Sequence, residues 1–265
     1  MKIGCCVNMF SDKSDAVGRQ YLPLVASCGY DYAELPLAQV MELTDAEFEK
    51  MLGELKDLQL CCEVCNNFFP AYVRLTGPDT DEKKIRDYLE KAVSRAERLG
   101  AKRIVFGSGG AKNVPEGFSK DTAFDQIVNV LQMAEEMTAP KGILIVIEPL
   151  NQKESNIILN LPDGKKLMEA VSRKGVVQLV DYYHYALEKE TTNILKQCAP
   201  NIYHVHVAHP EGRVFPKEID QGMRIFLDTL KDAGYDERIS IEAYSDDKEK
   251  DLQEFLQMFR AGTLY

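Results

Sequence analysis

The sequence lacks the features that would place the protein in a membrane or on nucleic acid. It contains no apolar run near the roughly 20 residues that a helix needs to cross a bilayer. It has 32 basic residues against 42 acidic ones, and the formal charge of −10 disfavours binding to phosphate backbones, which are held mainly by Lys and Arg. Its amino terminus, MKIGCCVNMF, lacks the long apolar core of a secretory signal. We therefore expect a cytoplasmic protein with no membrane and no nucleic-acid partner.

Motifs of a second domain or of a dinucleotide site are also missing. No Ser/Gly linker and no shift in composition divides the chain. The fingerprint GxGxxG is absent after the first strand-like run, which disfavours an open, doubly wound sheet that binds dinucleotides. A length of 265 residues fits one (β/α)₈ barrel, whose usual size is about 250 residues. We expect a single domain over residues 1–265.

Cysteines are present in an odd number, seven, and no second CxxC accompanies the pair Cys62 and Cys65. In a chain without a recognisable signal this favours free thiols in a reducing compartment. The pair lies in a predicted strand, where small buried side chains are the expected interpretation. A redox pair or half of a zinc site is the alternative.

Eight short apolar runs alternate with segments of helical spacing. The predicted strands are residues 1–7, 30–35, 60–64, 102–106, 143–148, 176–181, 202–207 and 239–242. The predicted helices are 16–28, 44–58, 80–99, 118–137, 162–173, 187–198, 217–233 and 248–260, the second of them starting with a capping box of Thr44 and Glu47. Alternation with short connections predicts a parallel sheet, and eight units predict closure. The expected fold is α/β, a single (β/α)₈ TIM barrel.

Four consecutive predicted strands carry one carboxylate or imidazole each near their carboxyl ends. These residues are Glu148, Asp181, His206 and Glu242. In a parallel barrel the carboxyl ends of the strands meet at one face, so the four side chains are expected to share one site. Three carboxylates and one imidazole suit a hard or borderline divalent ion such as Mn²⁺, Mg²⁺ or Co²⁺, whereas a structural zinc site uses more Cys or His. The alternative for each residue alone is a helix cap or a surface position.

Further polar residues follow the same strands. Asn151 and Glu154 come after Glu148 at intervals of three, so all three can face one cleft. His184 stands just past the end of its strand, within reach of a substrate oxygen, unless it is a capping or surface histidine. Arg213 lies in the loop after the seventh strand and could clamp a hydroxyl, carboxylate or phosphate, unless it is a solvated arginine.

Three other features receive weaker interpretations. His204 is expected to point away from His206 and to pack behind the site. The segment Gly107–Gly110 could cradle a phosphate on its backbone amides, although a tight connection is favoured. His209 receives no role.

Together these motifs resemble the xylose-isomerase-like sugar isomerase/epimerase superfamily. The similar branch contains ketose 3-epimerases, hydroxypyruvate isomerases and inosose dehydratases, and the resemblance covers nearly the whole chain. It is carried by Glu148-Pro-Leu-Asn151-x-x-Glu154, Asp181-x-x-His184, His204-x-His206, Gly212-Arg213 and Ile239-Ser-Ile-Glu242. The resemblance implies one divalent metal ion on Glu148, Asp181, His206 and Glu242, with Mn²⁺ expected first and Mg²⁺, Co²⁺ or Zn²⁺ as alternatives.

The resemblance also implies a reaction and a class of substrate. Glu148 and Glu242 would act as an acid/base pair that moves a proton through an enediolate, on a small-molecule sugar or sugar phosphate. The sequence departs from the ketose epimerases at His209, where an acidic residue is common, and in the spacing of the arginine, which is displaced by one residue. The departures concern the substrate and not the metal. The residues implied to contact the sugar are Glu154, His184 and Arg213.

Three other functions remain as alternatives. A lyase or dehydratase that acts on a keto-sugar or ketoinositol would use the same metal site. An apurinic-site endonuclease shares the fold but needs histidines from the first half of the barrel, and the first histidine here is His184. A non-catalytic sugar-binding barrel would not need both Glu148 and Glu242. The identity of the sugar is not determined, and a homo-oligomer is left open.

Overall fold

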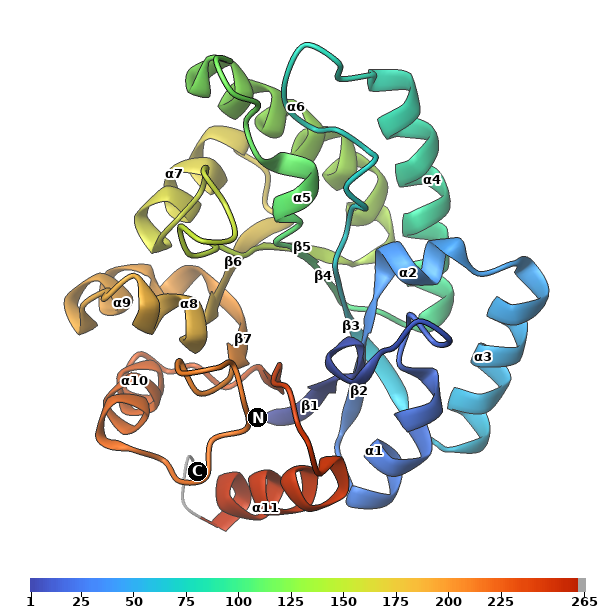
Figure 1. Cartoon of the computed structure of the whole chain (residues 1–265). Helices are drawn as coiled ribbons and strands as arrows, with labels where there is room; N and C mark the ends of the chain where they lie inside the picture. Colours follow the sequence, from blue (N-terminus) through green and yellow to red (C-terminus); the bar gives the residue numbers. More distant parts are fainter. Residues whose placement is uncertain (262–265) are drawn as a thin grey trace.

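The structure, a computed structural model, describes residues 1–261, in which eight parallel strands close into a barrel (Figure 1). Each strand pairs with the next one in the sequence, and the last pairs with the first. The predicted (β/α)₈ TIM barrel is therefore confirmed, and positions 262–265 of the predicted domain lie outside the described residues. The strands are β1 (Lys2–Cys6), β2 (Tyr32–Pro36), β3 (Cys61–Asn66), β4 (Arg103–Phe106), β5 (Leu144–Ile147), β6 (Val176–Asp181), β7 (Ile202–Val207) and β8 (Arg238–Ile241).

An outer ring of helices covers the barrel, as Figure 1 shows. Its members bury apolar stripes against the strands; α4, for example, buries Ile85, Leu89 and Ala96, and it ends at Gly100 with a φ of 87°. The predicted capping box before α3 is present. The ring consists of α1 (Leu22–Cys28), α3 (Asp45–Asp57), α4 (Glu82–Leu99), α6 (Lys120–Thr138), α7 (Leu161–Val171), α9 (Thr192–Cys198), α10 (Gln221–Asp232) and α11 (Lys248–Ala261).

Short helices directly after strands were not predicted. They are α2 (Leu37–Glu42), α5 (Gly109–Lys112), α8 (Tyr182–Leu187) and the 3₁₀ turn η1 (Val7–Phe10). Three further 3₁₀ turns adjoin helices: η2 (Arg19–Tyr21) comes before α1, η3 (Ala139–Lys141) after α6 and η4 (Ala199–Asn201) after α9. The predicted helices 187–198 and 217–233 also began too early, because α9 starts at Thr192 and α10 at Gln221. Segments this short contain less than two turns, so hydrophobic periodicity cannot reveal them. Within residues 1–261, no helix is long and apolar enough to cross a membrane.

Ion pairs close the end of the barrel where the strands begin. Arg103, the first residue of β4, is 4% exposed; it donates to the backbone oxygen of Tyr203 at 2.7 Å and pairs with Glu237. Arg238, the first residue of β8, donates to Glu63 through Nε at 2.6 Å, and the ammonium of Lys2 pairs with the same carboxylate. Each buried charge at this amino-terminal end therefore has a partner of opposite sign within the protein.

Candidate active site

The four predicted metal ligands meet at the opposite, carboxyl-terminal end of the barrel. Glu148 directly follows β5, Asp181 is the last residue of β6, His206 lies in β7, and Glu242 directly follows β8. One ligand atom from each lies within 4.8 Å of those of the others, and all four residues are buried. The alternative of four separate surface positions is therefore wrong, although Asp181 also caps a helix, and we name this group the carboxylate cluster.

Within the carboxylate cluster, the imidazole and one guanidinium contact the acidic groups directly. Nδ1 of His206 lies 2.9 Å from Oε2 of Glu242 and 3.2 Å from Oε1 of Glu148. Nη2 of Arg213 lies 2.6 Å from the same oxygen of Glu242 and 3.2 Å from Oδ2 of Asp181. Arg213 thus lies inside the site, and its guanidinium is also 4.7 Å from the centre of the Tyr183 ring.

Glycines after β4 let the cluster approach the backbone. A Cβ atom at Gly107 would lie 2.2 Å from Oε2 of Glu148, and one at Gly109 would lie 2.7 Å from the backbone oxygen of Glu154. Any side chain at position 107 would push the Glu148 carboxylate out of place. The segment Gly107–Gly110 therefore serves close packing, in agreement with the favoured interpretation.

Residues after β5 and β6 form a second hydrogen-bonded group beside the cluster. The backbone N–H of Asn151 donates to Nδ1 of His184 at 3.1 Å, and its side-chain amide donates to Glu154 at 3.0 Å. Asp181 accepts from the backbone N–H of Tyr183 at 2.9 Å and so caps α8, the helix that carries His184. Nε2 of His184 is buried, has no hydrogen-bond partner among residues 1–261, and lies 3.5 Å from Oδ2 of Asp181.

The pKa values of the three carboxyl groups depart from their ordinary values in different directions. Burial raises the pKa of Asp181 to about 7, although Arg213 opposes it. Burial also raises the pKa of Glu148, against the effect of His206. At Glu242 burial acts in the same direction, but Arg213 and His206 outweigh it, and the pKa falls to about 2.

The same buried surroundings lower the pKa values of two neighbouring basic groups. Burial, followed by the charge of Arg213, lowers the pKa of His184 to about 3, so this imidazole is neutral at pH 7. Burial lowers the pKa of Lys112, at the end of α5, to about 8. Its ammonium is fully buried and donates to the backbone oxygen of Glu148 at 3.3 Å. The sequence analysis gave Lys112 no role, and its place after the glycines is the signal that could have drawn attention to it.

Glu34, in β2, is the other residue that the sequence analysis missed. It is fully buried and contacts Nε2 of His206 at 2.9 Å and Nε2 of His204 at 3.0 Å. The prediction that His204 points away from His206 is wrong, because residues two apart on a strand share a face. A carboxylate near the end of a buried strand was the signal used for Glu148, and the same signal applies to Glu34.

The donor set of the carboxylate cluster fits a divalent cation. Three carboxylates and one imidazole nitrogen converge in a buried space, and Arg213 is the basic side chain that contacts two of these carboxylates. Buried carboxylates are stable only when they are paired, protonated or bound to a metal. Oxygen-rich sets with one imidazole are typical of hard and borderline ions.

Comparisons with known proteins agree with this geometry. Residues 22–262 match the family described as "Xylose isomerase-like TIM barrel". The chain belongs to this family. It is 30% identical over 138 residues to hydroxypyruvate isomerase from Escherichia coli (strain K12). The matched segment is 51% of this chain and 52% of that protein, so the match spans about half of the relative. It is 22% identical over 253 residues to D-psicose 3-epimerase from Agrobacterium fabrum, which is 92% of this chain and 85% of that protein.

A solved structure extends the likeness of fold to the whole barrel. The structure of D-allulose 3-epimerase from Methylomonas sp. in complex with D-allulose superimposes with a TM-score of 0.87. The alignment covers 100% of this chain and 97% of that one at 20% sequence identity. The predicted family is confirmed, and the relatives named here are sugar or hydroxy-keto isomerases and epimerases.

Proposed function

We propose that the protein is a divalent-metal-dependent isomerase or epimerase of a sugar or sugar phosphate. The observation that carries the proposal is the presence of two glutamates, Glu148 and Glu242, in one buried cluster. They come from β5 and β8, and each has an oxygen within 3.2 Å of Nδ1 of His206. A site with only a structural cation would not require two proton carriers there.

Glu148, Asp181, His206 and Glu242 would hold one ion, with Mn²⁺ expected first. When bound, it would polarise a carbonyl group of the substrate and acidify the neighbouring C–H bond. The protein supplies a dry, negatively charged site, because each of the four residues is at most 6% exposed. In such a site electrostatic effects are larger than in water.

The two glutamates would carry the proton. One carboxylate removes the proton from the carbon beside the carbonyl, which leaves an enediolate. If the other glutamate returns a proton to the opposite face of the same carbon, that carbon is inverted and the product is an epimer. If the proton returns to the former carbonyl carbon instead, and the hydroxyl proton moves from one oxygen to the other, an aldose and a ketose interconvert.

Three residues beside the cluster are proposed to bind the sugar. His184 is neutral, and its unpartnered Nε2 is available to a hydroxyl group. Arg213 lies among Glu242, Asp181 and Glu154, so its guanidinium can also reach a substrate oxygen in the same space. The Glu154 side chain is 37% exposed, which places it where the site opens toward solvent.

Hydrogen exchange in D₂O tests the proposal. The enzyme, Mn²⁺ and a panel of ketoses, ketose phosphates and ketoinositols are incubated, and the protons beside the carbonyl are followed by NMR. We expect deuterium to enter one carbon position of a product that is otherwise an isomer of the substrate. Glu148→Gln and Glu242→Gln should each slow the exchange by about 10²–10⁴-fold. Glu169→Gln, on the exposed face of α7, should not slow it.

Two outcomes would change the assignment. A product that has lost water would indicate the lyase alternative, in which the same enediolate expels a β-hydroxyl group. No exchange with any compound of the panel would contradict both reactions.

A further inference from the structure

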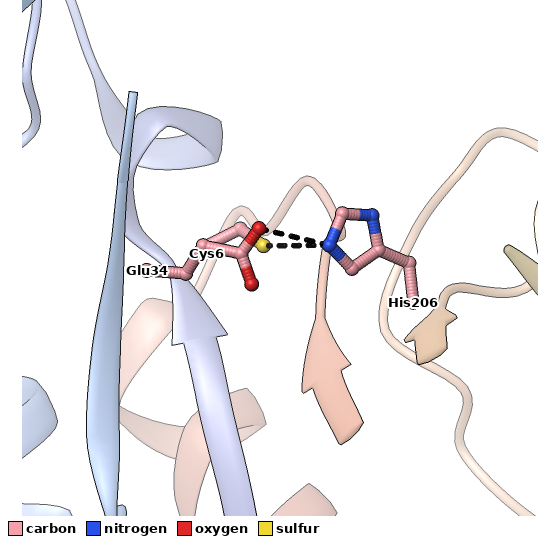
Figure 2. A group of neighbouring side chains, drawn as sticks. All are labelled: Cys6, Glu34 and His206. Carbon is pink, nitrogen blue, oxygen red and sulfur yellow. Dashed lines mark hydrogen bonds and ion pairs between the residues drawn. The ribbon is translucent and has the colours of Figure 1, made fainter. Parts of the chain in front are cut away.

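A buried carboxylate stands behind the histidine of the cluster. Figure 2 shows Glu34 and Cys6 on the side of His206 that carries Nε2. Oε1 of Glu34 lies 2.9 Å from this nitrogen, whereas the Cys6 sulfur is 4.0 Å from it. The other ring nitrogen, Nδ1, faces Glu148 and Glu242. The imidazole therefore lies between one carboxylate, Glu34, and the pair Glu148 and Glu242.

The Glu34 carboxylate is itself held in place. Its second oxygen accepts from the Ser240 hydroxyl at 2.6 Å and lies 3.0 Å from Nε2 of His204. The Ser240 hydroxyl is in turn 2.8 Å from the hydroxyl of Tyr32. A Cβ atom at Gly4 would lie 2.2 Å from the Tyr32 ring, so the glycine in β1 makes room for this chain of contacts.

Which nitrogen of His206 can bind a cation depends on where the proton lies in the neutral, metal-binding form of the ring. A neutral imidazole has one N–H and one lone pair. Glu148 and Glu242 attract the proton to Nδ1, where it would block coordination by that nitrogen. Glu34 attracts it to Nε2, which leaves the lone pair of Nδ1 directed at the cluster. Pairs of this kind, in which a ligating histidine donates its other N–H to a carboxylate, set ring orientation and ligand basicity.

We propose that Glu34 is a positioning residue that fixes the tautomer and orientation of His206 and thereby sets the metal affinity of the carboxylate cluster. Among residues 1–261, Glu34 forms no hydrogen bond or ion pair with a lysine or arginine, and its partners are His204, His206 and Ser240. Burial alone would lower the pKa of His206, but the charges of Glu34 and Glu242 outweigh it and hold this pKa well above its usual value, so the Glu34 carboxylate acts on the histidine of the cluster. The inference rests on the proposed metal site and is independent of the sugar chemistry.

The test compares the same substitution at the two ends of the barrel. Glu34→Gln keeps the size of the side chain but removes the charge, and its amide can donate to Nε2, which favours a proton on Nδ1. Glu63→Gln is the matched control. Glu63 is also a carboxylate in a barrel strand, but its ion-pair partners are Lys2 and Arg238, not His206. Mn²⁺ affinity is measured by titration, and the midpoint of thermal unfolding is measured for each variant. The four histidines of the chain make ¹⁵N-histidine NMR with Mg²⁺ a practical probe of the tautomer.

We expect Glu34→Gln to weaken Mn²⁺ binding by about 10–100-fold and to remove the proton from Nε2 of His206. Glu34→Asp should restore part of the affinity, Tyr32→Phe should change it by less than about threefold, and Glu63→Gln should leave it unchanged while lowering the unfolding midpoint. An affinity within twofold of the original for Glu34→Gln, with the proton still on Nε2, would overturn the proposal.

Two further results would also contradict it. The unaltered protein could bind two ions per chain, and Cys6→Ser and Glu34→Gln could each lose one of them. That result would make Glu34 a metal ligand instead of a positioning residue. If the unaltered protein binds no divalent ion, the metal site fails and this inference fails with it. A failure of the D₂O exchange experiment alone would leave the metal measurements intact, so the two proposals are tested separately.

Discussion

The two ends of the barrel both contain buried charges, but they satisfy them in different ways. At the amino-terminal end, Arg103 pairs with Glu237, and Arg238 and Lys2 pair with Glu63. At the carboxyl-terminal end, the three acidic side chains of the carboxylate cluster converge, with Arg213 against two of them. The first end is neutralised by the protein itself, whereas the second retains an excess of negative charge.

The pKa values express the same contrast. Burial raises the pKa of Glu63, but Lys2 and Arg238 outweigh it, and the net shift is downward. At Asp181 burial dominates, and the pKa rises to about 7. A carboxylate with a lowered pKa stabilises the fold at neutral pH, while one with a raised pKa destabilises it. The comparison indicates that Glu63 contributes stability at one end, whereas Asp181 and Glu148 give up stability at the other for a site that a cation can complete. Glu242, whose pKa is lowered by Arg213 and His206, does not share this cost.

The largest effect should come from the two glutamates. Glu148→Gln and Glu242→Gln should each reduce the rate of proton exchange by about 10²–10⁴-fold, the usual contribution of one general acid or base. The matched change at the other end, Glu237→Gln, should leave the rate unchanged. The NMR exchange assay measures all three. Equal losses of exchange rate in the three variants would contradict the assignment of catalysis to the carboxyl-terminal end alone.

The next effect concerns the room that a glycine leaves for Glu148. Gly107→Ala places a Cβ atom 2.2 Å from Oε2 of Glu148, so the carboxylate must move, and we expect a loss of about 10²-fold in exchange rate. Gly53→Ala is the control, because a Cβ atom in α3 at that position meets nothing within 4 Å. A Gly107→Ala variant with the original rate would show that the position of Glu148 is not critical.

A substitution at the amino-terminal end should affect stability alone. Arg103→Met removes the donor to Tyr203 and the partner of Glu237, so we expect a decrease of about 1–3 kcal/mol in the free energy of unfolding. Denaturant titration gives this value. Mn²⁺ affinity should stay within twofold of the original, and a larger change would mean that the two ends are energetically linked.

The smallest predicted effect is a pH-dependent change in thermal stability. A substitution of Asp181 in the carboxylate cluster should raise stability, whereas the substitution of Arg103 should lower it. The unfolded chain releases the Asp181 proton near the ordinary pKa of 3.8, whereas the folded chain retains it up to about pH 7. Stability contributed by this group is therefore lost as pH rises between these values. In the presence of a chelator, Asp181→Asn should raise the unfolding midpoint at pH 8 by about 2–5 °C and change it little at pH 4.

Added Mn²⁺ should reverse the order at pH 8, because only the original protein would gain stability from binding the ion. An Asp181→Asn variant that is less stable than the original at pH 8 without metal would contradict the assignment of Asp181 as an unsatisfied carboxylate. Thermal unfolding followed by circular dichroism measures both conditions.

Much of the barrel could be predicted because its signals are local. The strands 176–181 and 202–207 were predicted with the bounds that the structure has, and the four residues of the carboxylate cluster were found because each lies at or near the end of a buried apolar run. The short helix α8 was missed because its start depends on Asp181 as a cap, and α5 because its four residues are too few to show a hydrophobic period. Glu34 was missed because its partners, His204 and His206, are about 170 residues away in the sequence and meet it only across the closed barrel.

The most direct test of this account is the number of divalent ions that the carboxyl-terminal end binds. Elemental analysis and Mn²⁺ titration are made on the unaltered protein, on Asp181→Asn and His206→Ala at the site, and on Glu63→Gln at the other end. The account predicts one ion per chain in the unaltered protein and in Glu63→Gln, and affinity reduced by at least about tenfold in both site variants. Full metal affinity in Asp181→Asn and His206→Ala would contradict it.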